Sequence, residues 1–137
     1  MRIMPSIAAA CLSVVACAAL ADTPATEAAN LARVQKYVGA PVENFTMWNM
    51  YKWQGLGPDN LAVWTKVNEA YLLTVGQPCI HLQDARGIIV TSHMSHQVNR
   101  RMDYVSFGSQ HCQIIQIRPI DYKTMYKDGG SGVASKQ

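Results

Sequence analysis

Six cysteine and histidine side chains, which are frequent metal ligands, nucleophiles and bases, lie between residues 79 and 112. They are Cys79, His81, His93, His96, His111 and Cys112. The segment SHMSHQ, residues 92–97, places two histidines three positions apart with a methionine between them. The segment is compatible with a metal site, a catalytic site or ordinary solvated side chains.

A metal site in this segment would use His93, Met94 and His96, and such imidazole and thioether ligands suit copper. A structural zinc site needs four ligands, and a disulfide would remove both cysteines from the possible set. His111 and Cys112 are adjacent, and adjacent side chains on a strand point to opposite faces. We therefore predict solvated loop histidines and no metal or other cofactor. Metal binding through the His/Met loop is the alternative function.

Catalytic motifs are absent from the sequence. A hydrolytic triad could be imagined from Ser109, His111 and either Asp103 or Asp121, but triads are recognised by geometry and not by nearness in sequence. There is no G-x-S-x-G segment and no glycine-rich phosphate loop with a lysine. The nine acidic residues are scattered singly. We predict a non-catalytic protein with no catalytic residue, and a small hydrolase is a further alternative.

The beginning of the chain has the features of a secretory signal peptide. Arg2 is the only charged residue in residues 1–21, residues 7–20 are apolar or small apart from Ser13, and Ala19 and Ala21 form an A-x-A exit before Asp22. This pattern predicts a signal peptide over residues 1–21 and an exported protein, periplasmic or associated with the outer membrane. The apolar run is shorter than the roughly 20 residues of a membrane-spanning helix. No transmembrane segment is therefore expected in the mature chain.

A second reading of the same segment places a lipid anchor at Cys17. Residues 14–17, VVAC, approximate a lipoprotein cleavage box, in which the cysteine is lipidated and becomes the new N-terminus. A leucine is commoner at the first position of such a box. Cleavage after Ala21 and lipidation at Cys17 both remain open, and both predict export.

Cys11 and Cys17 fall within the leader, which leaves Cys79 and Cys112 in the folded domain. A pair of cysteines in an oxidising compartment usually forms a disulfide. Closing a loop of this length should stabilise the fold by roughly 3–4 kcal/mol. A redox-active pair would more usually have C-x-x-C spacing, which is absent. We predict a structural disulfide.

The charge of the chain argues against nucleic acid as a partner. Without Arg2, eleven basic residues face nine acidic residues, so the mature chain has a net charge of +2. Proteins that bind nucleic acid usually concentrate basic residues in one stripe. Here the basic residues are dispersed.

Residue patterns predict one α+β domain with an N-terminal helix followed by a mainly antiparallel β-sheet, a meander that could close into a barrel. A proline at the first turn and the apolar spacing of Leu31, Val34 and Val38 predict a helix over residues 24–38. Strands are predicted at residues 45–53, 61–65, 70–75, 88–91, 98–107 and 112–120, with one helical turn within residues 79–87. On the last strand, Ile115 and Ile117 are expected to share a face. The predicted organisation is signal peptide 1–21, helical segment 22–44, β-rich domain 45–127 and flexible tail 128–137.

Aromatic residues supply the candidate binding surface. Trp64 lies in the middle of a predicted strand, and we expect it in the core. Trp48 and Trp53 have opposite parity on one predicted strand, so one of them should face away from the main core. Exposed aromatic side chains on a sheet can bind sugars and peptides, and Tyr51 and Trp53 are the first candidates.

Three segments resemble a family of small exported bacterial envelope proteins that is known only as a domain of unknown function. They are LAVWTKVNEAYLL (residues 61–73), QPCIHL (77–82) and HCQIIQIRPID (111–121). The resemblance implies a signal-bearing or lipid-anchored protein with one cysteine pair, and it implies no activity. The expected function is a non-catalytic exported module of the cell envelope that binds an unknown protein or a cell-wall component.

Overall fold

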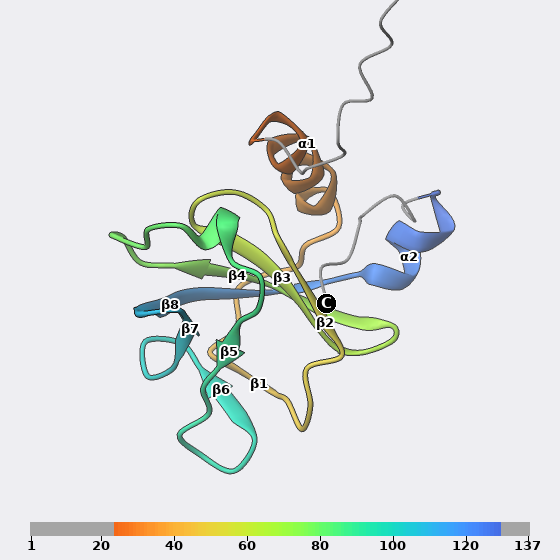
Figure 1. Ribbon diagram of the computed structural model, residues 1–137. Helices are drawn as coiled ribbons and strands as arrows, with labels where there is room; N and C mark the ends of the chain where they lie inside the picture. Colours follow the sequence, from red (N-terminus) through yellow and green to blue (C-terminus); the bar gives the residue numbers. More distant parts are fainter. Residues whose placement is uncertain (1–23, 130–137) are drawn as a thin grey trace, which may run out of the picture.

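Two antiparallel sheets carry most of the chain, and a helix lies at each end of the described segment (Figure 1). The computed structural model describes residues 24–129. In chain order the elements are α1 (Pro24–Gln35), β1 (Asn44–Thr46), β2 (Lys52–Gly55), β3 (Asn60–Lys66), β4 (Glu69–Val75), the 3-10 turn η1 (Leu82–Asp84), β5 (Ile89–Val90), β6 (Gln97–Asn99), β7 (Tyr104–Phe107), β8 (Gln110–Ile120) and α2 (Tyr122–Lys127). The predicted signal peptide with Cys17, and residues 130–137 of the predicted tail, lie outside this range. Neither α1 nor α2 is long and apolar enough to cross a membrane.

The larger sheet has six strands in the order β2-β3-β4-β8-β7-β5 and forms a half-barrel. β2, β3 and β4 follow one another as the predicted meander, and β8 then pairs with β4 in the middle of the sheet. β2 and β5 are the two edges, so the half-barrel is open. The predicted α+β class, with an N-terminal helix and a mainly antiparallel sheet, is confirmed.

The single strand predicted over residues 45–53 is wrong, because this segment contributes to two sheets. Phe45 of β1 pairs with Val98 of β6, whereas Trp53 of β2 pairs with Val63 of β3. Phe45 and Trp53 are both buried in the same core. Aromatic and β-branched side chains indicate a strand but not its partner, and the change of partner between residues 46 and 52 cannot be seen in composition.

The strand predicted over residues 98–107 is also divided. β6 ends at Asn99 and β7 begins at Tyr104, with a turn between them in which Arg101 has a φ of 69°. The buried carboxylate of Asp103 accepts a hydrogen bond from the backbone N–H of Asn99. Side chains of this type compete with strand pairing by binding their own backbone, and here that bond accompanies the break.

The two faces of the large sheet contribute to two cores. Leu61 and Val63 of β3 point into the half-barrel, and Ala62 and Trp64 point to the face that α1 and α2 cover. All four side chains are buried. The predicted burial of Trp64 is confirmed, and the core that contains it also anchors α2 through Met125.

Cys79 and Cys112 form the predicted disulfide, with Cα atoms 5.6 Å apart. Both residues are buried. The bond joins the segment that precedes η1 to the central strand β8, and it therefore anchors a loop with little regular structure to the middle of the sheet.

A β-bulge changes the expected alternation on β8. Thr74 pairs with Gln116 and Val75 pairs with Ile114, so Ile115 is the extra residue. Ile114 and Ile117 are therefore both buried in the half-barrel, and Ile115 is exposed. The prediction that Ile115 and Ile117 share a face is wrong for this reason.

Candidate binding surface

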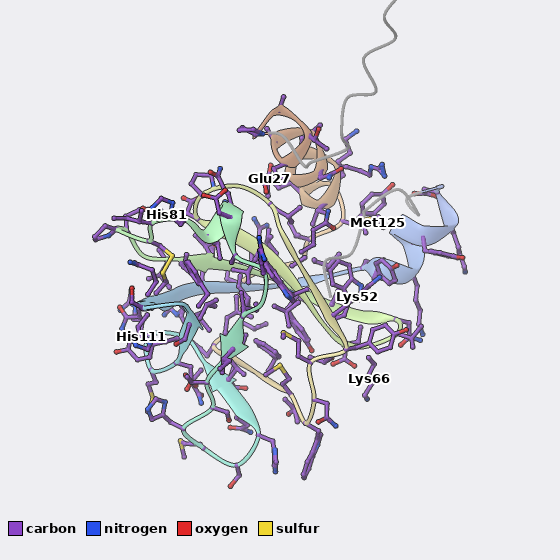
Figure 2. All side chains as sticks on the ribbon, viewed as in Figure 1. Glu27, Lys52, Lys66, His81, His111 and Met125 are labelled. Carbon is purple, nitrogen blue, oxygen red and sulfur yellow. A yellow bond between two sulfur atoms is a disulfide. The ribbon has the colours of Figure 1, made fainter. Side chains whose placement is uncertain are left out.

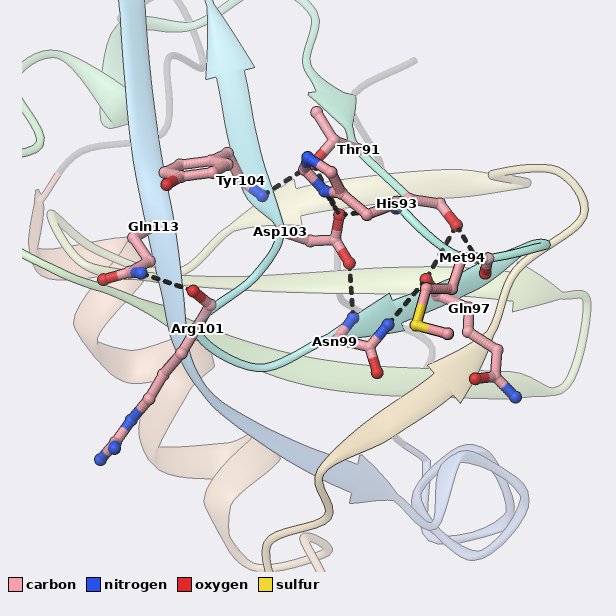
Figure 3. Close-up of polar contacts among 10 residues, drawn as sticks. Thr91, His93, Met94, Gln97, Asn99, Arg101, Asp103, Tyr104 and Gln113 are labelled. Atoms are coloured by element: carbon pink, nitrogen blue, oxygen red, sulfur yellow. Dashed lines mark hydrogen bonds and ion pairs between the residues drawn. The ribbon is translucent and has the colours of Figure 1, made fainter.

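His93, the first histidine of the predicted His/Met loop, binds a carboxylate. Its Nδ1 lies 2.6 Å from Oδ1 of Asp103, a residue with no exposed surface, and its backbone N–H donates to the same oxygen at 3.0 Å (Figure 3). The hydroxyl of Thr91 donates to Oδ1 at 3.0 Å, and the N–H of Asn99 donates to Oδ2 at 2.7 Å. These bonds hold the two ends of the loop together.

The surroundings of Asp103 act on its pKa in opposite directions. Burial of the carboxyl raises the pKa, whereas the hydrogen bonds from Asn99, His93 and Thr91 lower it, and the net effect is a pKa below the ordinary value. The carboxylate is therefore ionised and acts as a hydrogen-bond acceptor within its own loop.

The other two members of the His/Met loop, Met94 and His96, have different surroundings. The ring of His96 stacks on the indole of Trp48, with centroids 3.7 Å apart. Met94 is exposed. Across residues 24–129, no three His, Cys, Asp or Glu side chains gather as a possible metal site.

The histidine and the two alternative aspartates of the imagined hydrolytic triad have separate partners. His111 Nδ1 lies 2.8 Å from the hydroxyl of Ser106, its cross-strand neighbour, and Asp103 binds His93. The carboxylate of Asp121 accepts from the N–H and hydroxyl of Thr124 and caps α2. The hydrogen bonds in the described part of the chain thus assign these side chains to three separate local contacts.

The two predicted binding residues lie in different environments. Trp53 is 3% exposed and belongs to the core of the half-barrel, whereas Tyr51 is 54% exposed. Trp48, which was not selected from the sequence, is 70% exposed. The opposite parity of Trp48 and Trp53 predicts that one of them lies outside the core but does not identify which one.

Tyr51 lies at the edge of a hollow of about 450 Å³, which we call the tyrosine–lysine groove. Its lining residues come from the start of β2, the β3–β4 turn and α2: Tyr51, Lys52, Val67, Asn68, Tyr122, Lys123, Tyr126 and Lys127. Figure 2 shows Lys52, Lys66 and Met125 on the side of α2, away from His81 and His111. The groove is therefore well separated from the disulfide end of the molecule.

The short helix α2 positions half of the groove. Asp121 caps its first turn, and Met125, which has no exposed surface, anchors it in the core beneath. Tyr122 and Tyr126 are four residues apart and lie on one face of the helix, as do Lys123 and Lys127. This i, i+4 pattern was present in the sequence, but no helix was predicted over residues 122–127.

The groove is positively charged. Its lining contains three lysines and no acidic residue. Lys52 Nζ lies 4.5 Å from the centroid of the Trp64 ring and 5.4 Å from that of Tyr122, which are cation–π distances. Among the ion pairs found in residues 24–129, none involves Lys52, Lys123 or Lys127.

A family described as a family of unknown function (DUF6491) has a model that matches residues 1–130 of the chain. No curated protein and no solved structure matches the chain.

Proposed function

Because the chain belongs to a family of unknown function, DUF6491, we propose its function from its surface. The protein is a non-catalytic exported module of the cell envelope, and it binds an acidic protein or cell-wall component in the tyrosine–lysine groove. One observation carries this proposal: three lysines and three tyrosines line one hollow that contains no acidic residue.

The chemistry of the lining defines the ligand. Lysine ammonium groups attract carboxylates and phosphates, and charge complementarity of this kind speeds association and selects partners. Tyrosines add broad apolar contact at a small cost in side-chain entropy. Val67 and Tyr126 are 65% and 60% exposed, so this apolar surface is open to a ligand. An anionic ligand with an apolar or ring-shaped portion would fit both features.

The hydrogen bonds of Asp103 and Asp121 support a non-catalytic function. The hydrogen bonds of Asp103 fix its own loop, and those of Asp121 cap a helix. Export is the part of the proposal that rests on the leader-like residues 1–21.

The binding test uses protein purified in its native processed form with two probes. The first is purified peptidoglycan sacculi, whose stem peptides carry carboxylates, and the second is a fluorescent poly-glutamate peptide. Co-sedimentation and fluorescence anisotropy measure the two affinities. We expect binding that weakens with added salt and that falls about tenfold in the variant Lys123→Glu/Lys127→Glu. Cell fractionation with an intact mass tests export.

A matched variant, Lys36→Glu/Arg86→Glu, changes the net charge equally at exposed residues outside the groove lining. It should keep the affinity of the unmodified protein apart from a small general effect of charge. Equal losses in both variants would show attraction to the overall charge and would reject the groove. Absence of binding to both probes would reject the proposed ligand class. Binding to one probe alone would identify a cell-wall or a protein ligand.

A further inference from the structure

Trp48 exposes most of its indole ring but is not loosely held. The side chain is 70% exposed, and one face of the ring stacks on His96 with an interplanar angle of 25°. The exposed part of the ring offers a flat apolar surface on which a ligand can pack. Only part of that ring is covered within the described chain.

Backbone hydrogen bonds position His96, the residue on which Trp48 stacks. The N–H of Met47 donates to the carbonyl of His96 at 2.7 Å, and this bond extends the pairing of β1 with β6. His96 has a φ of 62°, in the left-handed region that a residue with a side chain adopts at a cost in energy. In the neighbouring turn, which contains Met94 and Gln97 (Figure 3), the N–H of Gln97 donates to the carbonyl of Met94. The hydroxyl of Ser92 donates to the carbonyl of Gln97. These bonds define the backbone position of His96, on whose ring Trp48 stacks.

A hollow of about 310 Å³ lies beside the exposed tryptophan. The residues around it are Thr46, Trp48, Asn49, Thr65, Lys66 and Glu69. Five of these six side chains are polar, and together they offer hydroxyl, amide, ammonium and carboxylate groups. The hollow thus combines one aromatic surface with several hydrogen-bonding groups.

The carboxylate of Glu69 is held in place on this surface. Its Oε1 accepts from the hydroxyls of Thr65 at 3.0 Å and Tyr71 at 3.1 Å, and Lys66 Nζ lies 3.7 Å from Oε2. Burial, followed by the bond to Glu69, raises the pKa of Tyr71 to about 12, so its hydroxyl keeps its proton and remains a donor. Glu69 therefore presents remaining acceptor capacity at a defined position.

We infer that Trp48 and this hollow form a carbohydrate-binding site. Pyranose rings have an apolar face of C–H groups that packs on an aromatic ring, and an equatorial edge of hydroxyls that needs donors and acceptors. The hollow supplies both: the Trp48 ring stacks on His96, and Thr65 and Tyr71 hold the Glu69 carboxylate. A single carboxylate beside a lysine is a poor cation site. The inference concerns residues other than those lining the tyrosine–lysine groove and stands independently of it.

The test uses the natively processed protein with chitotriose and cellotriose as probes, which differ in their N-acetyl groups. Calorimetry gives the affinity, and two-dimensional NMR follows the indole N–H of Trp48 and the side-chain amide of Asn49. We expect both signals to shift at millimolar sugar. Trp48→Ala should weaken binding by about tenfold or more, and Trp48→Phe should retain part of the affinity.

Tyr104→Ala is the matched control, because Tyr104 is an exposed aromatic residue that lines neither this hollow nor the groove. It should leave sugar affinity unchanged. Since Trp48 is largely exposed, the melting temperature of Trp48→Ala should stay near that of the unmodified protein, which shows that the fold is intact. The inference is overturned if neither sugar shifts the Trp48 signal, or if Trp48→Ala and Tyr104→Ala bind sugar equally.

Discussion

A single side chain, Asp103, joins the two ends of the loop between β5 and β6. Its carboxylate accepts from Thr91 and His93 on one side of the loop and from Asn99 on the other. The hydroxyl of Thr91 in turn accepts from the N–H of Tyr104, where β7 begins. His93 thus has a structural partner that its spacing to His96 had not indicated.

Replacing Asp103 with asparagine should destabilise the protein by about 2–3 kcal/mol at pH 7. The amide keeps one acceptor oxygen but turns an NH₂ group toward buried donors, which leaves polar groups without partners. Chemical denaturation of Asp103→Asn against the unmodified protein measures the difference. Asp84→Asn is the control, because Asp84 contacts His81 in a pair that is largely exposed on both sides, and little change is expected there.

The same variant should alter the response to acid. Since the pKa of Asp103 is depressed in the folded state, its stabilising contribution is complete above the unfolded pKa of about 3.9 and is lost as the pH falls through the lower folded pKa. The difference in unfolding free energy between the unmodified protein and Asp103→Asn should therefore shrink below about pH 4. A difference that stays constant to lower pH would contradict this role.

Among the elements, α2 has a functional importance beyond its length. A helix of one to two turns is unstable alone, and α2 depends on its cap at Asp121 and on the buried side chain of Met125. Its tyrosines and lysines then become one wall of the groove. The ordering of this wall therefore depends on contacts with the sheet beneath.

Met125→Ala should cost about 2–5 kcal/mol of stability, as for other large-to-small changes in a core. It should also weaken binding to the acidic probes, because α2 loses its anchor, while sugar binding at Trp48 is preserved. Thermal unfolding and the two binding assays measure these effects. Undiminished binding to the acidic probes by a destabilised Met125→Ala variant would show that α2 is held by other contacts.

Across the whole molecule, the candidate binding features and the disulfide lie at different ends. Lys52 and Lys66, at the edges of the two hollows, are on the side of α2, and the disulfide is near His81 and His111 (Figure 2). Both hollows include residues of the β3–β4 turn region, with Val67 and Asn68 in one and Lys66 and Glu69 in the other. The β3–β4 turn region therefore contributes to both hollows.

Cys79→Ser/Cys112→Ser should lower the unfolding free energy by roughly 3–4 kcal/mol, because the unfolded chain is no longer constrained by the loop. At a temperature where the variant remains folded by circular dichroism, both binding activities should be retained. Loss of binding by a folded variant would indicate that the disulfide end also shapes the binding end.

The sequence alone determined features that depend on local pattern and on residue chemistry. The helix that begins at Pro24, the meander of β2 to β4, the burial of Trp64 and the pairing of Cys79 with Cys112 all follow from such information. Apolar spacing reports a buried face within one element, and two cysteines in an exported chain have few alternatives. Tyr51 was likewise recognised as a candidate for exposure.

Tertiary structure decided which side chains meet. The division of residues 45–53 and 98–107, the bulge at Ile115 and the selection of Trp48 over Trp53 for exposure all depend on partners distant in sequence. A bulge inserts one residue, so the side chains that follow it lie on the opposite faces from those that strict alternation predicts. A buried carboxylate meets its hydrogen-bond donors only after the chain has folded. The groove itself joins β2, the β3–β4 turn and α2, and its charge and shape arise only when these segments pack together.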